Sequence, residues 1–279
     1  GGTREVNRED ITSQMVRRVT PVNLVYGNNM QSRVRTRAPL RKFKNDKQFM
    51  EGVSVITCTN RPEYRERIIA NYMRQYYGPV ELIIILNNNA ANLGEWEAWA
   101  QSYPNVRVYQ LDESVTLGEC LNFGVKHARY GYVAKFDDDD YYAGPYLQQA
   151  VDAIKTTGAD IVGKCSIFVY FEGSGTLAIA HQNHEERFVS MLAGATMVIN
   201  KRVFNRVRFK HINQGEDTDF QLNCNQQGVR MFSTNKYNFA CIRRAQTDTH
   251  TWRVEEKEYL RFCRVMDQVD DFRETVTAY

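Results

Sequence analysis

The segment that decides the fold reads YVAKFDDDD and covers residues 132–140. Its first five residues, 132–136, form a short and largely apolar run that passes directly into four aspartates, residues 137–140. A run of this length is typical of a strand buried in a sheet. Because ligands of open α/β sheets collect at the carboxyl ends of the strands, the aspartates are predicted to lie in a ligand site.

Short apolar runs and amphipathic stretches alternate in the residues before this segment. The apolar runs predict strands at 53–58, 80–86 and 106–109. The spacing of apolar residues between them predicts helices at 63–77, 93–102 and 116–128. This alternation is typical of an α/β fold in which a mixed, mainly parallel sheet is flanked by helices.

Polar residues follow two of these strands. Asn60 and Arg61 come after the first, and the run from Asn87 to Asn89 comes after the second. Because the carboxyl ends of parallel strands meet at one edge of a sheet, we expect both loops to lie beside the aspartates. Asn60 and Arg61 are equally typical of an ordinary turn between a strand and a helix, so both interpretations stay open.

The residues after the aspartates predict a second group of elements. Strands are expected at 161–163, 167–171 and 195–199, and helices at 146–157, through 224–227 and at 255–269. The acidic pair Glu216 and Asp217 stands just before one of these helices. Acidic residues also suit the start of a helix because they interact favourably with its dipole, which is the alternative to a catalytic role.

The overall composition argues against several kinds of partner. The net charge of +3 arises from 36 basic and 33 acidic residues among 279, a balance that does not indicate nucleic acid. The six cysteines form no C-x-x-C pair, so we expect reduced thiols in a cytoplasmic protein. No stretch approaches the roughly 20 apolar residues that span a bilayer.

Residues 1–50 differ from the rest because they are polar and strongly basic between Arg33 and Lys47. A solvated arm is the simplest interpretation. Attachment to an anionic membrane or polymer, or packing as a subunit arm, is the alternative. The predicted location is therefore the cytoplasm, with membrane association on the cytoplasmic face as the second choice.

A spaced set of residues leads into the aspartates: Asn122, Gly124, Ala128, Gly131 and Tyr132. Together with the acidic run, this set resembles the family 2 glycosyltransferases, in which a similar segment precedes a metal-binding D-x-D motif. Members of that family have the nucleotide-sugar-binding α/β fold called GT-A. The resemblance extends over about residues 52 to 255.

The resemblance implies a division of the chain. Residues 51–255 would form the GT-A catalytic domain, with a Rossmann-like nucleotide-binding half at 52–142 and an acceptor half at 143–255. Residues 1–50 would form a basic extension, and residues 256–279 a C-terminal helical segment.

The resemblance also implies site residues. Asp139 is expected to bind Mn²⁺ or Mg²⁺ directly, with Asp137 and His250 as further ligands; a satisfied core histidine is the alternative for His250. Asp217 is the expected catalytic base, and Glu216 would bind the acceptor or orient Asp217. The nucleotide would contact Thr57, Thr59, Asn60, Arg61, Asn87, Asn88, Asn122, Asp137 and Asp138.

Charge supports a metal site, because four adjacent carboxylates would repel one another strongly without a cation. Asp140 is expected to be structural. Arg243 and Arg244 are expected to form a solvated surface pair, with contact to phosphates as the alternative.

One position departs from the family pattern. Members commonly have an Asp-Asp pair after the second strand, where a carboxylate receives the uracil N–H, whereas this sequence has Asn87 and Asn88. An asparagine carbonyl can accept the same hydrogen bond. A UDP-sugar is therefore the favoured donor, and other bases stay open.

The predicted function is transfer of a sugar from a nucleotide-diphosphate sugar to a hydroxyl of a carbohydrate or glycoconjugate, with inversion, in polysaccharide or glycoconjugate synthesis. A retaining GT-A transferase is one alternative. A catalytically silent carbohydrate- or nucleotide-binding scaffold is another. A nucleotidyltransferase is disfavoured because no glycine-rich phosphate loop precedes the acidic site.

Overall fold

The computed structural model describes residues 50–244 and 256–278, which belong to one compact unit. Nearly all of the basic extension lies outside the described residues, so its role and the cellular location stay predictions. Within the described ranges, no helix is both long enough and apolar enough to cross a membrane. The six cysteines all have free thiols.

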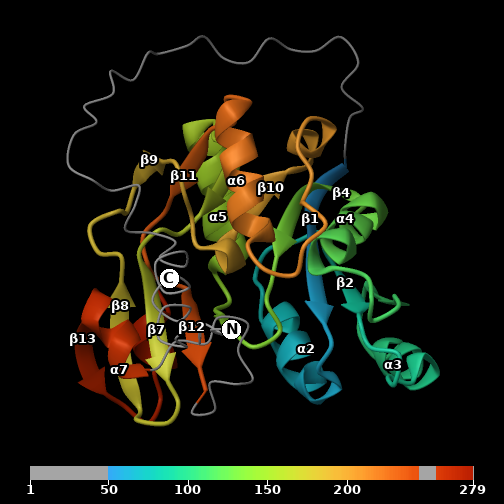
Figure 1. Cartoon of the computed structure of the whole chain (residues 1–279), viewed down its shortest axis with the longest axis horizontal. Helices are drawn as coiled ribbons and strands as arrows, with labels where there is room; N and C mark the ends of the chain where they lie inside the picture. The colour runs from blue at the N-terminus through green and yellow to red at the C-terminus, as the bar shows by residue number, and fades with distance from the viewer. Residues whose placement is uncertain (1–49, 245–255, 279) are drawn as a thin grey trace, which may run out of the picture. The chain divides into compact units, whose positions relative to one another are not determined.

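Four parallel strands form one half of the first sheet (Figure 1). They are β1 (Met50–Thr59), β2 (Val80–Leu86), β3 (Val106–Gln110) and β4 (Tyr130–Lys135), in the order β3-β2-β1-β4. Neighbouring strands run parallel throughout this part of the sheet. Every residue of β2 after Val80 is buried, as expected of a parallel strand covered on both faces. The strands overlap the apolar runs that predicted them.

Four shorter strands extend the sheet beyond β4. In order, they are β10 (Val198–Asn200), β6 (Ile161–Gly163), β11 (Met231–Ser233) and β9 (Arg187–Val189). Since β10 is antiparallel to both β4 and β6, the sheet is mixed. The predicted fold class, a mixed and mainly parallel sheet flanked by helices, is confirmed.

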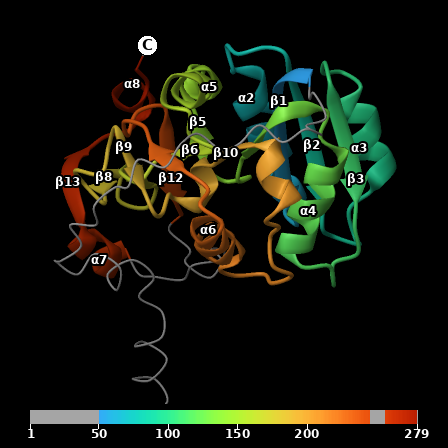
Figure 2. The same cartoon turned by 90° about the horizontal axis from the view of Figure 1, so that it is seen from above.

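Helices cover both faces of this sheet (Figure 2). On one face, an apolar cluster joins the sheet to α2 (Arg65–Met73), α3 (Leu93–Ala100) and α5 (Tyr146–Thr157). On the other face, a second cluster joins it to α4 (Leu117–His127) and α6 (Glu216–Gln226). Leu121 of α4 and Phe220 of α6 are among the buried residues of that second cluster.

Helix α2 is shorter than the predicted helix at 63–77. A 3₁₀ turn, η1 (Pro62–Tyr64), precedes it, and it ends at Met73. The chain then leaves the helix because the Tyr76 N–H donates to the carbonyl of Gly144 at 3.0 Å. This pairing with a distant segment outweighs the helical spacing of the apolar residues.

Helix α4 lies close to β1 because Gly124 has no side chain. A Cβ atom at this position would lie 2.6 Å from Cγ2 of Ile56, which is closer than carbon atoms pack. The helix begins at a capping box in which Thr116 and Glu119 satisfy each other's backbone N–H groups. Gly124 therefore sets the distance between the helix and the strand whose end reaches the site.

A second sheet lies beside the first along the chain's later half (Figure 1). Its strands are β13 (Cys263–Gln268), β8 (Thr176–Ala180), β7 (Ile167–Phe171), β12 (Phe239–Arg243) and β5 (Tyr141–Tyr142), in that order. Strand β5 directly follows the aspartates. The acidic run therefore connects a central strand of the first sheet to an edge strand of the second.

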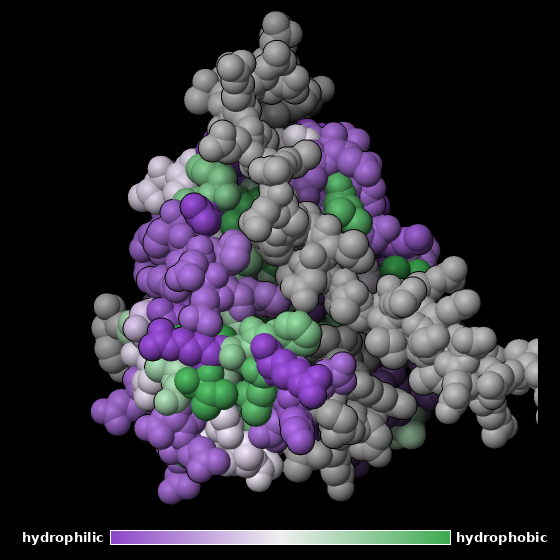
Figure 3. Space-filling view, turned by 60° about the vertical axis from the view of Figure 1, so that its left-hand side comes forward, coloured by the Kyte–Doolittle hydropathy of each residue, from purple (hydrophilic) through white to green (hydrophobic). Residues whose placement is uncertain are grey.

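The predicted C-terminal helical segment is wrong for much of its length. Short helical turns occur at α7 (Glu256–Tyr259), η5 (Leu260–Phe262) and α8 (Arg273–Val276), but residues Cys263–Gln268 form β13. Strand β13 pairs antiparallel with β8, so hydrogen bonds to another segment decide its conformation. Met266, which contributed to the helical spacing, is 44% exposed. The side of the molecule shown in Figure 3 carries apolar residues among hydrophilic ones.

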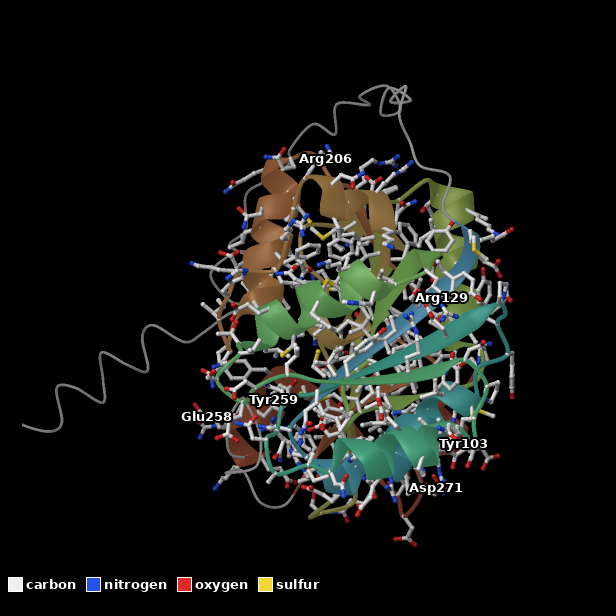
Figure 4. The ribbon with its side chains drawn as sticks, turned by 90° about the vertical axis from the view of Figure 1, so that its right-hand side faces the viewer. Tyr103, Arg129, Arg206, Glu258, Tyr259 and Asp271 are labelled. Atoms are coloured by element: carbon white, nitrogen blue, oxygen red, sulfur yellow. The ribbon has the colours of Figure 1, made fainter. Side chains whose placement is uncertain are left out.

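One carboxylate is completely buried at the start of β2. Glu81 accepts hydrogen bonds from the Ser54 hydroxyl and from a guanidinium nitrogen of Arg107, each at 2.7 Å. It also accepts the backbone N–H of Arg129 at 2.7 Å, just before β4 begins (Figure 4). The carboxylate thus joins the first residues of the parallel strands at the edge opposite the aspartates.

We predict that Glu81→Gln lowers the free energy of unfolding by about 3 kcal/mol or more, because it leaves the Arg107 charge without its buried partner. Urea denaturation followed by circular dichroism measures this loss. The matched control is Glu51→Gln, since Glu51 pairs with Lys155 at side-chain exposures of 68% and 49%. That variant should stay within about 0.5 kcal/mol of the wild-type protein. Equal losses for the two variants would contradict the prediction.

Candidate active site

The four aspartates lie at the carboxyl end of β4, and each side chain meets different partners. Asp137 forms an ion pair with Lys135. Asp138 is buried and accepts a hydrogen bond from Oγ1 of Thr59 at 2.5 Å. Both of its carboxylate oxygens also pair with the guanidinium group of Arg61. The first two aspartates are therefore neutralised by residues of β4 and of the loop after β1.

The last two aspartates face the second sheet. Oδ2 of Asp139 lies 3.0 Å from a guanidinium nitrogen of Arg61 and 3.0 Å from one of Arg244. Asp140 is buried, and its Oδ1 accepts the N–H of Ile242 in β12 at 3.0 Å. Burial raises the pKa of Asp140 well above its usual value. Basic side chains of the protein thus relieve the repulsion that the sequence interpretation had assigned to a bound cation.

The polar loops after β1 and β2 meet beside the aspartates. The Asn88 side chain donates to the carbonyl of Asn60 at 2.9 Å. The backbone N–H of Asn87 donates to the carbonyl of Thr59 at 2.8 Å, and its side-chain Nδ2 donates to the carbonyl of Asp112 at 2.7 Å. These contacts place the two loops together at the carboxyl ends of the parallel strands, as the sequence predicts.

Three arginines gather around the ring of Tyr64 at this edge. The guanidinium carbons of Arg61, Arg67 and Arg244 lie 4.7, 5.2 and 5.3 Å from the ring centroid. Arg244 also donates a hydrogen bond to the Tyr64 hydroxyl, and Arg67 donates to the backbone carbonyl of Asp139 at 2.8 Å. Such distances are favourable for a cation over an aromatic ring.

The prediction that Arg243 and Arg244, at the end of β12, form a solvated surface pair is wrong. The Arg244 side chain is only 12% exposed, and it contacts Asp139 and Tyr64. Arg243 is buried, with its guanidinium carbon 5.6 Å from the centroid of the Tyr259 ring. Arg243 therefore packs on Tyr259, and Arg244 points to the acidic loop.

The candidate base lies in the first turn of α6. The Oδ1 atom of Asp217 accepts a hydrogen bond from the backbone N–H of Thr218 at 2.6 Å. Its Oδ2 faces Gly194, where an added Cβ would be only 1.6 Å away. The loop that carries Gly194 is held to α6 because the Gln221 side chain bonds both the N–H and the carbonyl of Leu192, at 2.7 and 3.2 Å.

Tyr142 joins the acidic loop to this second loop. Its hydroxyl accepts the N–H of Asp137 at 2.8 Å and donates to the carbonyl of Ala195 at 2.7 Å. Its ring stacks on Phe136 with the centroids 3.7 Å apart. Because Gly194 precedes Ala195, the aspartates and the candidate base border the same short segment.

A buried lysine interacts electrostatically with both acidic groups. Burial alone would lower the pKa of Lys135, but the charges of Asp137, Glu216 and Asp217 raise it overall. For Glu216, burial raises the pKa to about 7, with Lys135 acting in the opposite direction. Lys135 therefore keeps its positive charge and is shared electrostatically by residues that lie far apart in the sequence.

Two predicted site residues are not brought into this arrangement. Thr57 is buried within β1. Asn122 uses its side-chain amide on the backbone of Phe209, donating to the carbonyl at 2.8 Å and accepting the N–H at 3.1 Å. Its contacts indicate that it holds the chain near Phe209 in place. His250 lies outside the described residues.

The chemistry of the loop suits a divalent cation. Asp137 and Asp139 offer carboxylate oxygens, with side-chain exposures of 37% and 16%. Within residues 50–244 and 256–278, no group of three or more histidine, cysteine, aspartate or glutamate side chains is arranged as a metal site. A cation of the Mg²⁺ type commonly takes one or two carboxylates and completes its shell with water and substrate phosphates. Two carboxylates are therefore a sufficient protein contribution.

Sequence reasoning missed three residues of this site, Lys135, Tyr142 and Gly194, and gave Arg244 a site role only as the alternative. The signal for Lys135 was a lysine inside an apolar strand, two positions before the first aspartate. Gly194 and Arg244 gave no local signal because their partners lie in distant segments, and Tyr142 gave none although it bonds the nearby Asp137 as well as Ala195.

Solved structures confirm the fold. TarS from S. aureus, residues 1–349 in complex with UDP-GlcNAc, superposes with a TM-score of 0.57 at 16% identity, covering 76% of this chain and 64% of that one. The mannosyltransferase PcManGT from Pyrobaculum calidifontis, in complex with GDP-Man and Mn²⁺, gives a TM-score of 0.52 at 15% identity, covering 77% and 60%. At such identities the likeness shows a shared GT-A fold.

Sequence relatives agree with the structural neighbours. An uncharacterized glycosyltransferase of Rickettsia bellii is 29% identical over 140 residues, and one of Rickettsia conorii is 28% identical over 100. The alignments cover 46% and 36% of this chain, but only 20% and 16% of those relatives. The model of glycosyl transferase family 2 matches residues 54–235, which is well over half of the 279 residues. The chain therefore belongs to glycosyl transferase family 2.

Proposed function

We propose that the protein transfers a sugar from a nucleotide-diphosphate sugar to a hydroxyl of a carbohydrate or glycoconjugate acceptor. One observation carries the proposal: the acidic loop and Asp217 border the same segment, at Gly194 and Ala195, and the charge of Lys135 acts on both. This arrangement lies within the residues that match the family model. It gives a donor side and a base side to one site, as group transfer requires.

The donor side consists of the loops after β1, β2 and β4. The structures of TarS and PcManGT contain UDP-GlcNAc and GDP-Man, which supports a nucleotide-sugar donor here. Asn87 donates its Nδ2 to Asp112, so its amide oxygen is the group that would accept an N–H of the base. We favour a UDP-sugar for this reason. Asn60, Arg61 and Asn88 would border the nucleotide.

A divalent cation is part of the proposal, and Asp139 and Asp137 would hold it. Mn²⁺ or Mg²⁺, when bound, neutralises the diphosphate that leaves as the glycosidic bond breaks. The Mn²⁺ in the PcManGT complex supports this choice of cofactor. The protein's own contribution is the direction of the two carboxylates, which Lys135 and the arginines fix.

Asp217 would act as the general base. Its carboxylate takes the proton of the acceptor hydroxyl while that oxygen attacks the anomeric carbon, and the bond from that carbon to the diphosphate oxygen breaks. A single displacement of this kind inverts the anomeric configuration. Glu216 is half protonated near neutral pH because burial raises its pKa to about 7, so it suits binding of the acceptor better than proton abstraction.

We predict that Asp139→Asn weakens Mn²⁺-dependent binding of the nucleotide at least about tenfold, because one carboxylate ligand is lost. Isothermal calorimetry with a panel of nucleotide sugars measures the change and identifies the donor. Asp152→Asn, an exposed change on α5, is the control. If the wild-type protein binds no nucleotide sugar in the presence of Mn²⁺ or Mg²⁺, the proposed function is wrong.

We predict that Asp217→Asn lowers kcat about 10²- to 10⁴-fold and leaves donor affinity within about twofold, because only proton transfer is lost. Steady-state kinetics on the acceptor that the panel supports, with calorimetry for the donor, separates the two effects. Asp219→Asn, in the same helical turn, should change kcat less than about threefold. An unchanged rate would refute the role of Asp217, and a product with retained configuration would refute inversion.

We predict that Gly194→Ala lowers kcat at least about tenfold, because the new Cβ would occupy the position of the Asp217 carboxylate and displace it. Thermal unfolding should show a folded protein, so that the loss reports the displaced base. Gly94→Ala on α3 is the control, since a Cβ there meets nothing closer than 3.4 Å. Equal rates for the wild-type protein and Gly194→Ala would show that the contact with Asp217 has no catalytic importance.

A further inference from the structure

Asp139, the carboxylate expected to bind the cation, already has two positively charged partners. Arg61 and Arg244 each place a guanidinium nitrogen 3.0 Å from its Oδ2. Both arginines come from outside the acidic loop, one from the end of β1 and one from the end of β12. A cation that approaches Asp139 must therefore compete with them for the same oxygen.

The two arginines differ in how firmly they are held. Arg61 also makes a two-point ion pair with Asp138, which is buried and fixed by Thr59. Arg61 can therefore keep its place without Asp139. Arg244 has Tyr64 as a second partner, through a hydrogen bond to the hydroxyl and a cation–π contact at 5.3 Å. Its guanidinium can turn from Asp139 without leaving the ring.

The three arginines at this edge are already paired with carboxylates. Arg61, Arg67 and Arg244 form ion pairs with Asp138, Glu172 and Asp139. A divalent cation on Asp139 would add positive charge that repels the arginines. A diphosphate supplies the missing negative charge, and guanidinium groups bind phosphate oxygens with two-point geometry.

We propose that Arg61 and Arg244 hold Asp139 in the free protein, and that Arg244 turns to the diphosphate of the donor when donor and cation bind together while Arg61 stays on Asp138. This inference rests on the proposed function, because it assigns Arg244 to the same donor. The exchange makes the binding of the two ligands cooperative: the diphosphate draws a competitor of the cation away from Asp139, and the cation takes the carboxylate that held Arg244. Such coupling is reciprocal.

The test uses Arg244→Gln in the full chain, with two ligands measured separately. Mn²⁺ alone is titrated by electron paramagnetic resonance, and UDP or GDP is titrated by calorimetry in saturating Mn²⁺. We expect opposite shifts. Mn²⁺ alone should bind at least about threefold more tightly, because a competing cation is gone. The nucleotide should bind at least about tenfold more weakly, because a charged hydrogen bond to phosphate is lost.

Two further variants make the test specific. Arg206→Gln removes an arginine at the end of η3 (Lys201–Asn205), which is labelled in Figure 4, and should change neither affinity. Arg244→Lys keeps the charge and loses the planar, two-point geometry. It should leave the Mn²⁺ affinity within about twofold of that of the wild-type protein. It should lower the nucleotide affinity, but by less than Arg244→Gln does. This variant also serves if Arg244→Gln does not fold, which thermal unfolding would show.

The outcomes separate this inference from the proposed function. If the wild-type protein binds nucleotide with Mn²⁺ but Arg244→Gln binds Mn²⁺ alone no better, the exchange is refuted and the function stands. An unchanged nucleotide affinity in Arg244→Gln refutes it as well. If the wild-type protein binds neither UDP nor GDP, the proposed function fails, and tighter Mn²⁺ binding by Arg244→Gln still supports competition at Asp139.

Discussion

Four consecutive carboxylates at the end of one strand are the constraint on which this structure depends. Unrelieved, their charges would repel strongly at such short separations. The protein pairs the first three with basic side chains, Lys135 for Asp137, Arg61 for Asp138, and Arg61 with Arg244 for Asp139, while Asp140 accepts a backbone N–H. These pairs exist before any ligand arrives, so the basic residues are as much a part of the site as the acids.

The same constraint connects the two sheets. Asp140 takes a backbone N–H of β12, and Arg244 at the end of that strand reaches back to Asp139. Tyr142, two residues beyond Asp140, links the acidic loop to Ala195. The second sheet is thus attached at the point where the donor is expected to bind. Its position follows from the charges of the loop as well as from apolar packing.

The sequence predicted those parts of the fold that depend on local patterns. The parallel strands were visible because a buried strand such as β2 must be apolar along its whole length. The meeting of Asn60, Asn88 and the aspartates followed from the topology alone. The partners of the acids were not visible, because Arg244 and Tyr64 stand 180 residues apart and neither has a distinctive neighbourhood. Strand β13 was mistaken for a helix because its pairing with β8 leaves no periodic signal in an exposed segment.

The charge of Lys135 makes the effects of substitutions at the surrounding acids depend on one another. Its buried ammonium group is shared by Asp137, Glu216 and Asp217, so removing any one of these charges changes the field at the other two. Losses measured for single variants of these acids should not add up, since each contains part of the same interaction. The acidic loop and the start of α6 are thus coupled through one buried charge.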